Sequence, residues 1–214
     1  MQKPYEMRFM NFEIRAEETE QQMGRLTGRP VVYGSRADIG PYDEIIEPGA
    51  LDHADLRDVR LLVNHNAMMI PLARSRNNNE NSTMQLILVP EGMDFRSDID
   101  IKRNTDAMNL YSAVDRGDIS GMSFRFAVDE DSWEGLETDH PTRHIRSISR
   151  IVEISAVTFP AYAATSIEAR GISDALESAR EALESAKAAA RSIERQKQKI
   201  KIMMEMEDTP NEKH

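Results

Sequence analysis

The chain has 214 residues, which suits one domain of ordinary size with an additional segment. Hydrophobic residues make up 40% of the chain and charged residues 30%, and no run of about 18 apolar residues is present, which argues against a disordered chain and against a membrane protein. The formal net charge of −10 disfavours binding to the phosphate backbone of a nucleic acid.

The absence of cysteine excludes disulfides, thiolate nucleophiles and cysteine-based zinc sites. The five histidines are scattered and form no HExxH or HxH pair, so we expect neither a metal nor another cofactor. Residues 1–10 contain no continuous apolar stretch followed by a small-residue cleavage site. A cytoplasmic protein is therefore the simplest expectation.

Short runs rich in Val, Ile and Phe, separated by Gly, Pro, Asn and Asp, predict one β-rich domain over residues 1–165. The expected strands are 6–14, 30–33, 59–63, 83–89, 93–99, 121–128, 142–148 and 151–159. Apolar residues within 105–116 recur at helical spacing, and Gly117 supplies the end of the helix predicted there.

The composition changes at Ser166 to Ala, Glu, Ser, Lys and Arg, which predicts a helix over 166–207 followed by a disordered tail over 208–214. Thr165 and Glu168 fit a capping box, and we expect Gly171 to interrupt the first turns, with the main run starting near Ser173.

Apolar side chains recur along this helix in alternating steps of three and four, with only Lys197 breaking the pattern. They are Ile172, Leu176, Ala179, Leu183, Ala186, Ala190, Ile193, Ile200 and Met204. This seam indicates either a coiled-coil partner or a face that docks on the domain. Residues 191–201 carry five bases and one acid, which suit an acidic partner or a solvated face.

Six carboxylates and the only tryptophan lie within 129–139, which we interpret as an exposed loop. Paired carboxylates could belong to a glycosidase or a metal-dependent hydrolase, but the ligand spacing of a calcium loop is absent.

Three polar residues in apolar surroundings are the candidates for chemistry. His65 follows a strand whose faces both look buried, and continued alternation would place its ring on the face of Val59, Leu61 and Val63. A lone histidine in such a place is more often structural than catalytic.

Ser123 lies on the opposite strand face from Met122, Phe124 and Phe126, after a glycine that allows close backbone approach, whereas Ser120 is the weaker candidate. Glu153 stands within an apolar strand, where a carboxylate needs a cation or a donor. An imidazolium, Arg146 or Arg150 would each meet that need. A serine, a histidine and a carboxylate on three strands have the composition of a nucleophile, a base and an orienting group.

Four segments, in order, resemble motifs of the HK97-like phage prohead (capsid maturation) proteases, which are similar in fold and active-site layout to the herpesvirus assemblins. The resemblance extends over roughly residues 8–165. The segments are EIIEPGAL at 44–51, LVNHN at 62–66, GDISGMSFRF at 117–126 and VEISAVTFPAY at 152–162.

This resemblance implies an α+β fold with a barrel-like, β-rich protease domain over residues 1–165 and a long C-terminal helix. It also implies a serine endopeptidase in which Ser123 is the nucleophile, His65 the general base and Glu153 the third member, where assemblins use a second histidine. The oxyanion donors stay unassigned between backbone amides and a bound water.

The implied substrates are the major capsid protein and scaffold segments inside an assembling procapsid, together with the protease itself. The resemblance to assemblins also suggests a homodimer. The helix over 166–207 would then be an assembly tether that packages the enzyme with its substrate. A competing hypothesis is a non-catalytic assembly factor that binds capsid protein, in which the three polar residues are structural.

Overall fold

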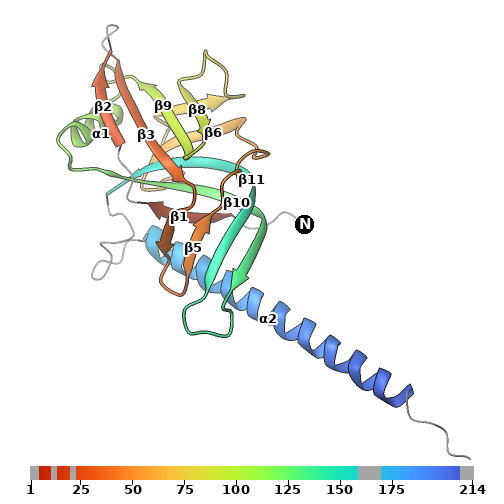
Figure 1. The fold of residues 1–214 in the computed structure, drawn as a ribbon. Coiled ribbons are helices and arrows are strands. Elements are labelled where there is room, and N and C mark those ends of the chain that lie inside the picture. The colour runs from red at the N-terminus through yellow and green to blue at the C-terminus, as the bar shows by residue number, and fades with distance from the viewer. Residues whose placement is uncertain (1–4, 11–13, 20–22, 159–169, 208–214) are drawn as a thin grey trace, which may run out of the picture.

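The computed structural model describes residues 5–10, 14–19, 23–158 and 170–207. Within these ranges the chain forms two β-sheets, a short helix and a long C-terminal helix (Figure 1). The predicted α+β class with a long C-terminal helix is confirmed, although the described strands form two sheets and no closed barrel. The predicted tail over 208–214 lies outside the described residues.

The first sheet has seven strands, and its central members are two long neighbours. Strand β10 (Gly121–Glu134) pairs antiparallel with β11 (Thr142–Val157) along nearly its whole length. Strand β1 (Glu6–Met10) pairs with the free edge of β10. Strands β5 (Asp43–Ile46) and β6 (Asp58–Val63) both pair with β11. At the outside, β4 (Arg36–Asp38) pairs with β5, and β7 (Ala73–Arg76) pairs with β6.

The second sheet has the order β2 (Ile14–Glu18), β3 (Gly24–Val32), β9 (Gly92–Ile99) and β8 (Met84–Val89). Helix α1 (Thr105–Asp115) starts at Asn104, whose side chain accepts from two backbone amides of the first turn. It is followed by Gly117 at φ 79°, as expected for a helix end. The two sheets and α1 share one apolar core.

Several predicted boundaries are wrong because strand partners, not local periodicity, decide them. The single strand expected over 6–14 is split between β1 and β2, which belong to different sheets. The strands expected over 142–148 and 151–159 are one strand, β11, in which Ser149 donates to the carbonyl of Ala127. The acidic segment 129–139 is not a loop throughout, since its first six residues continue β10.

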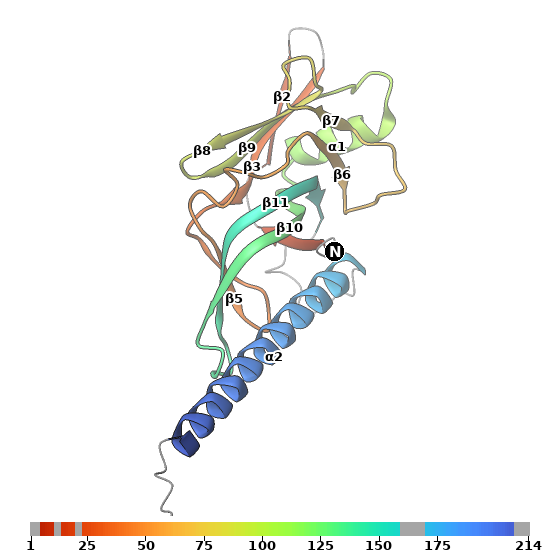
Figure 2. The same ribbon diagram turned by 90° about the vertical axis from the view of Figure 1, so that its right-hand side faces the viewer.

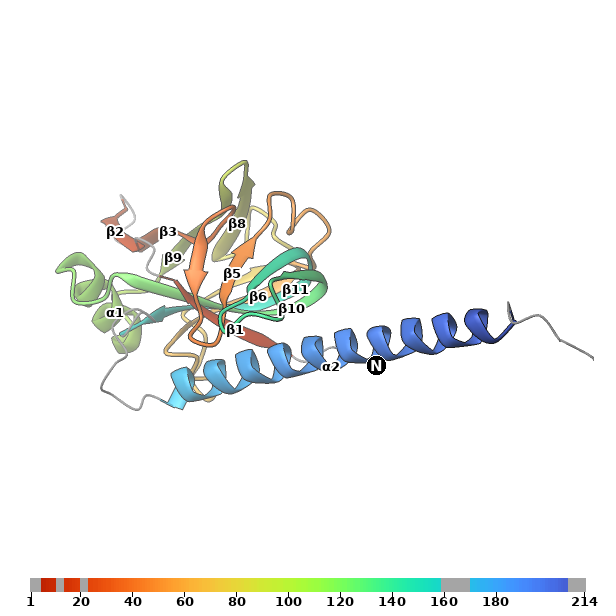
Figure 3. The same ribbon diagram turned by 60° about the horizontal axis from the view of Figure 1, so that its bottom comes forward.

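Helix α2 (Arg170–Glu207) runs beside β1 and the β10–β11 pair and then projects beyond the strands (Figures 2 and 3). Gly171 lies inside this helix and does not interrupt it, and the predicted capping box falls outside the described residues. Ala179 and Leu183 are buried against Tyr42, so the first part of the seam docks on the domain. Ile200 and Met204, farther along the seam, are 58% and 63% exposed.

No described helix is long and apolar enough to cross a membrane.

A buried network of two glutamates and two arginines, with Asp131 at its exposed edge, fastens β1 to the sheet. Arg8 donates to both carboxylate oxygens of Glu44, 2.7 Å from the farther one, and also to Glu6. Arg143 donates to Glu6 at 3.0 Å and to Asp131 at 2.6 Å. Burial by itself would raise the pKa of Glu6, but attraction to Arg8 and the hydrogen bond from Arg143 leave that pKa below its usual value.

Glu44→Gln should lower the free energy of unfolding by about 3–5 kcal/mol, because it leaves the buried Arg8 guanidinium without its main counter-charge. Asp118→Asn is the matched control, since the Arg116–Asp118 pair is more than half exposed and should contribute little. Urea unfolding of the two variants measures the difference. Equal stability of both variants would show that the network does not hold β1.

Candidate active site

Strand β10 presents Ser123 on its polar face. Phe124 and Phe126 point into the core and stack on each other with ring centroids 4.7 Å apart, so Ser123 and Arg125 take the other face. The register pairs Ser123 with Ser155 of β11 and Arg125 with Glu153. Ser123 is nevertheless 0% exposed, so the polar face of this strand is covered.

His65 is presented by a tight turn after β6, rather than by the strand. The expected alternation does not reach His65, because β6 ends at Val63 and both Asn64 and His65 adopt left-handed backbone conformations, with φ 50° and 55°. Asn adopts this backbone region readily, whereas most other residues that carry a β-carbon adopt it at a cost in conformational energy.

The side chain of Asn64 holds this turn against the end of β11. Its Nδ2 donates to the Thr158 hydroxyl at 3.0 Å, and its Oδ1 accepts from the Thr158 amide at 3.0 Å. The Asn64 amide in turn donates to the carbonyl of Ala156 at 3.0 Å. These bonds fix the turn that carries His65 relative to the strand that carries Glu153.

Glu153 lies on β11 between β10 and β6. It pairs with Arg125 on one side and, in parallel register, with Arg60 on the other. A bulge follows at once, since Phe126 is opposite Ile151 and not Val152. The Glu153 side chain is only 6% exposed, so its carboxylate needs a hydrogen-bond donor.

The imidazole of His65 supplies that donor and joins the three candidate residues. Nδ1 is hydrogen-bonded to Oε1 of Glu153, and Nε2 lies 2.6 Å from Oγ of Ser123. Because an ionised carboxylate only accepts hydrogen bonds, Nδ1 carries the proton and Nε2 turns its lone pair to the serine hydroxyl. Such an arrangement can take a proton from the hydroxyl while the carboxylate stabilises the resulting imidazolium.

The nucleophile candidate has a further contact that the sequence does not indicate. Oγ of Ser123 also lies 2.7 Å from the backbone carbonyl oxygen of Arg8, which is an alternative acceptor for its one proton. The only sequence signal is the charged Arg8 inside the apolar run of β1.

The other candidates lie elsewhere. Ser120 is exposed and precedes β10, and neither Arg146 nor Arg150 is bonded to Glu153: Arg146 donates to Ser132, and Arg150 approaches Asp55 at 3.9 Å. His144 is bonded to Glu47 at 2.6 Å and so takes no part with Ser123.

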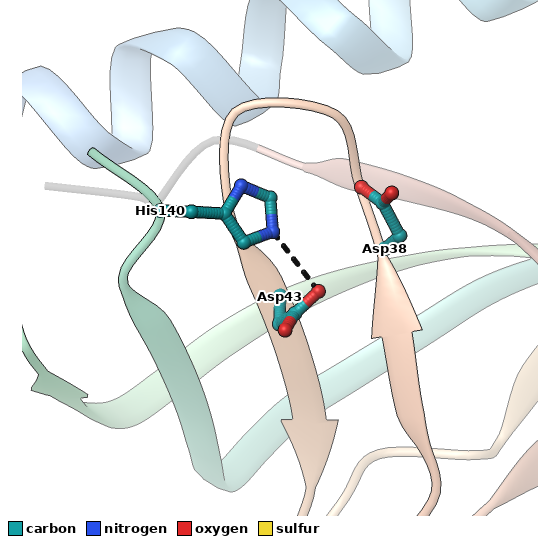
Figure 4. Close-up of side chains that lie close together, drawn as sticks. All are labelled: Asp38, Asp43 and His140. Carbon is teal, nitrogen blue, oxygen red and sulfur yellow. Dashed lines mark hydrogen bonds and ion pairs between the residues drawn. The ribbon is translucent and has the colours of Figure 1, made fainter. Parts of the chain in front are cut away.

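One group of side chains has the composition of a metal site. Asp38, Asp43 and His140 place a ligand atom each within 4.8 Å of one another (Figure 4). Asp43 already accepts from His140 at 3.1 Å and from Arg36 at 2.9 Å. Burial raises the pKa of Asp43, but these two donors lower it by more, which leaves a carboxylate already occupied by protein donors. We assign no metal to this group.

Comparison with known proteins adds independent information. Residues 10–178 match the sequence model of a family described as Caudovirus prohead serine protease. Among solved structures, the chain is similar to the capsid assembly protease gp21 of bacteriophage T4, with 12% identity and a TM-score of 0.38 over 72% of this chain and 99% of that one. No curated protein matches the chain.

Asn64→Ala should lower the free energy of unfolding by about 1–3 kcal/mol and shift the ¹⁵N signals of the His65 ring, because it strains the turn and removes the bonds to Thr158. Asn77→Ala is the control, since Asn77 has φ 56° in a turn between β7 and β8. That variant should pay the same backbone cost without moving the His65 signals. Unchanged His65 signals in Asn64→Ala would contradict a positioning role for Asn64.

Proposed function

The chain belongs to the Caudovirus prohead serine protease family, whose members act in capsid assembly and maturation, and on this premise we propose that Ser123, His65 and Glu153 are its catalytic triad. The single observation that carries the proposal is the His65 ring, which bridges the buried Glu153 carboxylate and the Ser123 hydroxyl. The three residues come from β10, from the turn after β6 and from β11.

In the proposed reaction, Nε2 of His65 takes the proton of the Ser123 hydroxyl as Oγ attacks the carbonyl carbon of a peptide bond. The tetrahedral intermediate collapses when the imidazolium returns this proton to the departing amine, which breaks the C–N bond and leaves an ester on Ser123. A water molecule then repeats the attack with His65 as base, which releases the new carboxyl end and restores the serine. Glu153 stays ionised throughout and orients the ring through Nδ1.

The proposed substrates are the major capsid protein, scaffold segments and the protease itself, inside an assembling procapsid in the host cytoplasm. The division into a protease domain over 1–165 and a helical assembly segment over 166–207 belongs to the same proposal, as does a homodimer. The assembly role of the helix is supported by the part of α2 that projects beyond the strands, where Ile193, Ile200 and Met204 are more than half exposed on one seam. Exposed apolar side chains in a row are typical of a binding surface.

Ser123→Ala or His65→Ala should abolish self-cleavage and capsid processing, with rates lowered by roughly three orders of magnitude or more. Glu153→Gln should lower them by about two or more orders, because the amide no longer stabilises the imidazolium. Ser120→Ala, which removes an exposed hydroxyl three residues away, is the matched control. Intact masses followed over time, alone and during co-assembly with the capsid protein, measure processing. Identical processing of the wild type and Ser123→Ala would point to another protease, and no processing of either during co-assembly would favour the non-catalytic assembly factor.

Ile200→Lys should reduce incorporation of the protease into procapsids several-fold without changing peptide cleavage, because it places a charge on the free seam of α2. Ile202→Lys is the matched control, since Ile202 is 56% exposed but points about 200° away around the helix. Counting protease copies per purified procapsid decides the matter. The seam is not the tether if both variants are incorporated equally.

A further inference from the structure

The serine proposed as nucleophile is out of reach of any peptide in this structure. Ser123 is 0% exposed, and its hydroxyl lies within hydrogen-bond distance of both Nε2 of His65 and the carbonyl of Arg8. A hydroxyl carries one proton, so the bond to Arg8 competes with transfer of that proton to His65. The structure therefore shows the site in a resting arrangement.

Strand β1 occupies the edge of β10 beside Ser123. All five of its residues pair antiparallel with β10, and the register sets Phe9 opposite Ser123. The other edge of β10 is taken by β11. An extended peptide binds a sheet by adding a strand to an open edge, where its backbone meets that of the neighbouring strand. At Ser123 that place is filled by β1, whose Arg8 carbonyl oxygen can accept a hydrogen bond from Oγ.

A chain of contacts links β1 to α2. Arg8 donates to the Tyr42 hydroxyl at 3.1 Å, and the Tyr42 ring is buried together with Ala179 and Leu183 of α2. Helix α2 also packs directly against β1. Strand β1 therefore contacts α2 and is paired along one edge with β10.

The contact between α2 and the domain is incomplete. A groove of about 870 Å³ lies between them, lined on the helix by small side chains such as Ala182, Ala186 and Ala189 and on the domain by Tyr5 and Glu6. Alanines bury little apolar area, so detaching this helix costs less than detaching one with a leucine seam. The tight part of the contact is at Ala179 and Leu183.

We propose that β1 is a latch that covers Ser123, that the buried Arg8–Glu44 pair and α2, through Tyr42, together hold this latch closed, and that an extended peptide substrate pairs with β10 in the place that β1 vacates. This inference rests on the proposed function of Ser123 as the nucleophile. It makes the isolated protein latent and couples its activation to whatever moves α2 away from β1.

A reversible disulfide between β1 and β10 tests the latch, because the chain has no cysteine of its own. Met7 and Arg125 are paired in the register, and Nη2 of Arg125 lies 3.2 Å from Sδ of Met7. Met7→Cys with Arg125→Cys would lock the two strands, and the disulfide is smaller than the side chains that it replaces. The matched control is Gln85→Cys with Arg96→Cys, which locks β8 to β9 in the other sheet.

The readout is the rate at which a fluorophosphonate probe labels Ser123, located by peptide mass spectrometry. The oxidised Met7–Arg125 lock should be labelled at least about tenfold more slowly than its reduced form, while the control lock should be labelled equally in both states. Equal labelling of the oxidised and reduced Met7–Arg125 pair would overturn the latch alone. No labelling of Ser123 in any folded form, the opened variant Leu183→Ala included, would overturn the proposed function and the latch with it.

The role of α2 is tested by Leu183→Ala, which removes the side chain that packs on Tyr42. Its Ser123 should be labelled several-fold faster than that of the wild type. Ile202→Ala makes the same kind of truncation at an exposed position of the same helix, off the seam, and should leave the rate unchanged. An unchanged rate in Leu183→Ala would overturn the part of the proposal that assigns the hold on β1 to α2.

Discussion

Strand β11 shares one edge with β10 over most of its length and divides its other edge between β5, at its start, and β6, near its end. This double pairing determines where every candidate side chain lies. It places Glu153 between the serine strand and the strand that leads to His65, so that a single imidazole can reach both partners. Without the parallel register of β6 against β11, His65 would have no carboxylate in reach. The site therefore depends on contacts between segments that are 58 and 88 residues apart in sequence.

Buried charge is handled in two different ways on the two sides of β10. On one side, Glu153 is matched with an imidazole that can gain or lose a proton. On the other, Glu6 and Glu44 are matched with two guanidiniums, which stay charged at any working pH. Buried ion pairs of the second kind add little net stability, but breaking one leaves an uncompensated buried charge. The network thus fixes the register of β1 against β10, and through it the position of the Arg8 carbonyl beside Ser123.

The residues of the candidate site could be found from sequence because each is polar within an apolar run, and because the motifs around them resemble one family. That these three side chains approach one another could not be predicted from sequence, since their approach depends on strand pairing. The turn at Asn64 and His65 illustrates this: alternation along β6 predicts the wrong face, and the left-handed backbone becomes explicable only once Thr158 lies beside it. The break between β1 and β2 was hidden for the same reason, because apolar residues recur from Met7 to Ile14 with no Gly or Pro to mark a boundary, and only the partners differ.

The seam of α2 has one periodicity but two environments. Near Leu183 it meets Tyr42, whereas from Ile193 onward its side chains are exposed, so sequence alone left docking and partner binding as alternatives and the structure shows docking for the first part only. The helix rises about 1.5 Å per residue, which places Met204 about 30 Å beyond Leu183. A continuous helix of that length acts as a lever: a force that tilts its free end is transmitted, and amplified, at the place where the helix meets the domain. That place is Tyr42, the residue that contacts Arg8, so capture of the free end by a partner would act on the strand that covers Ser123.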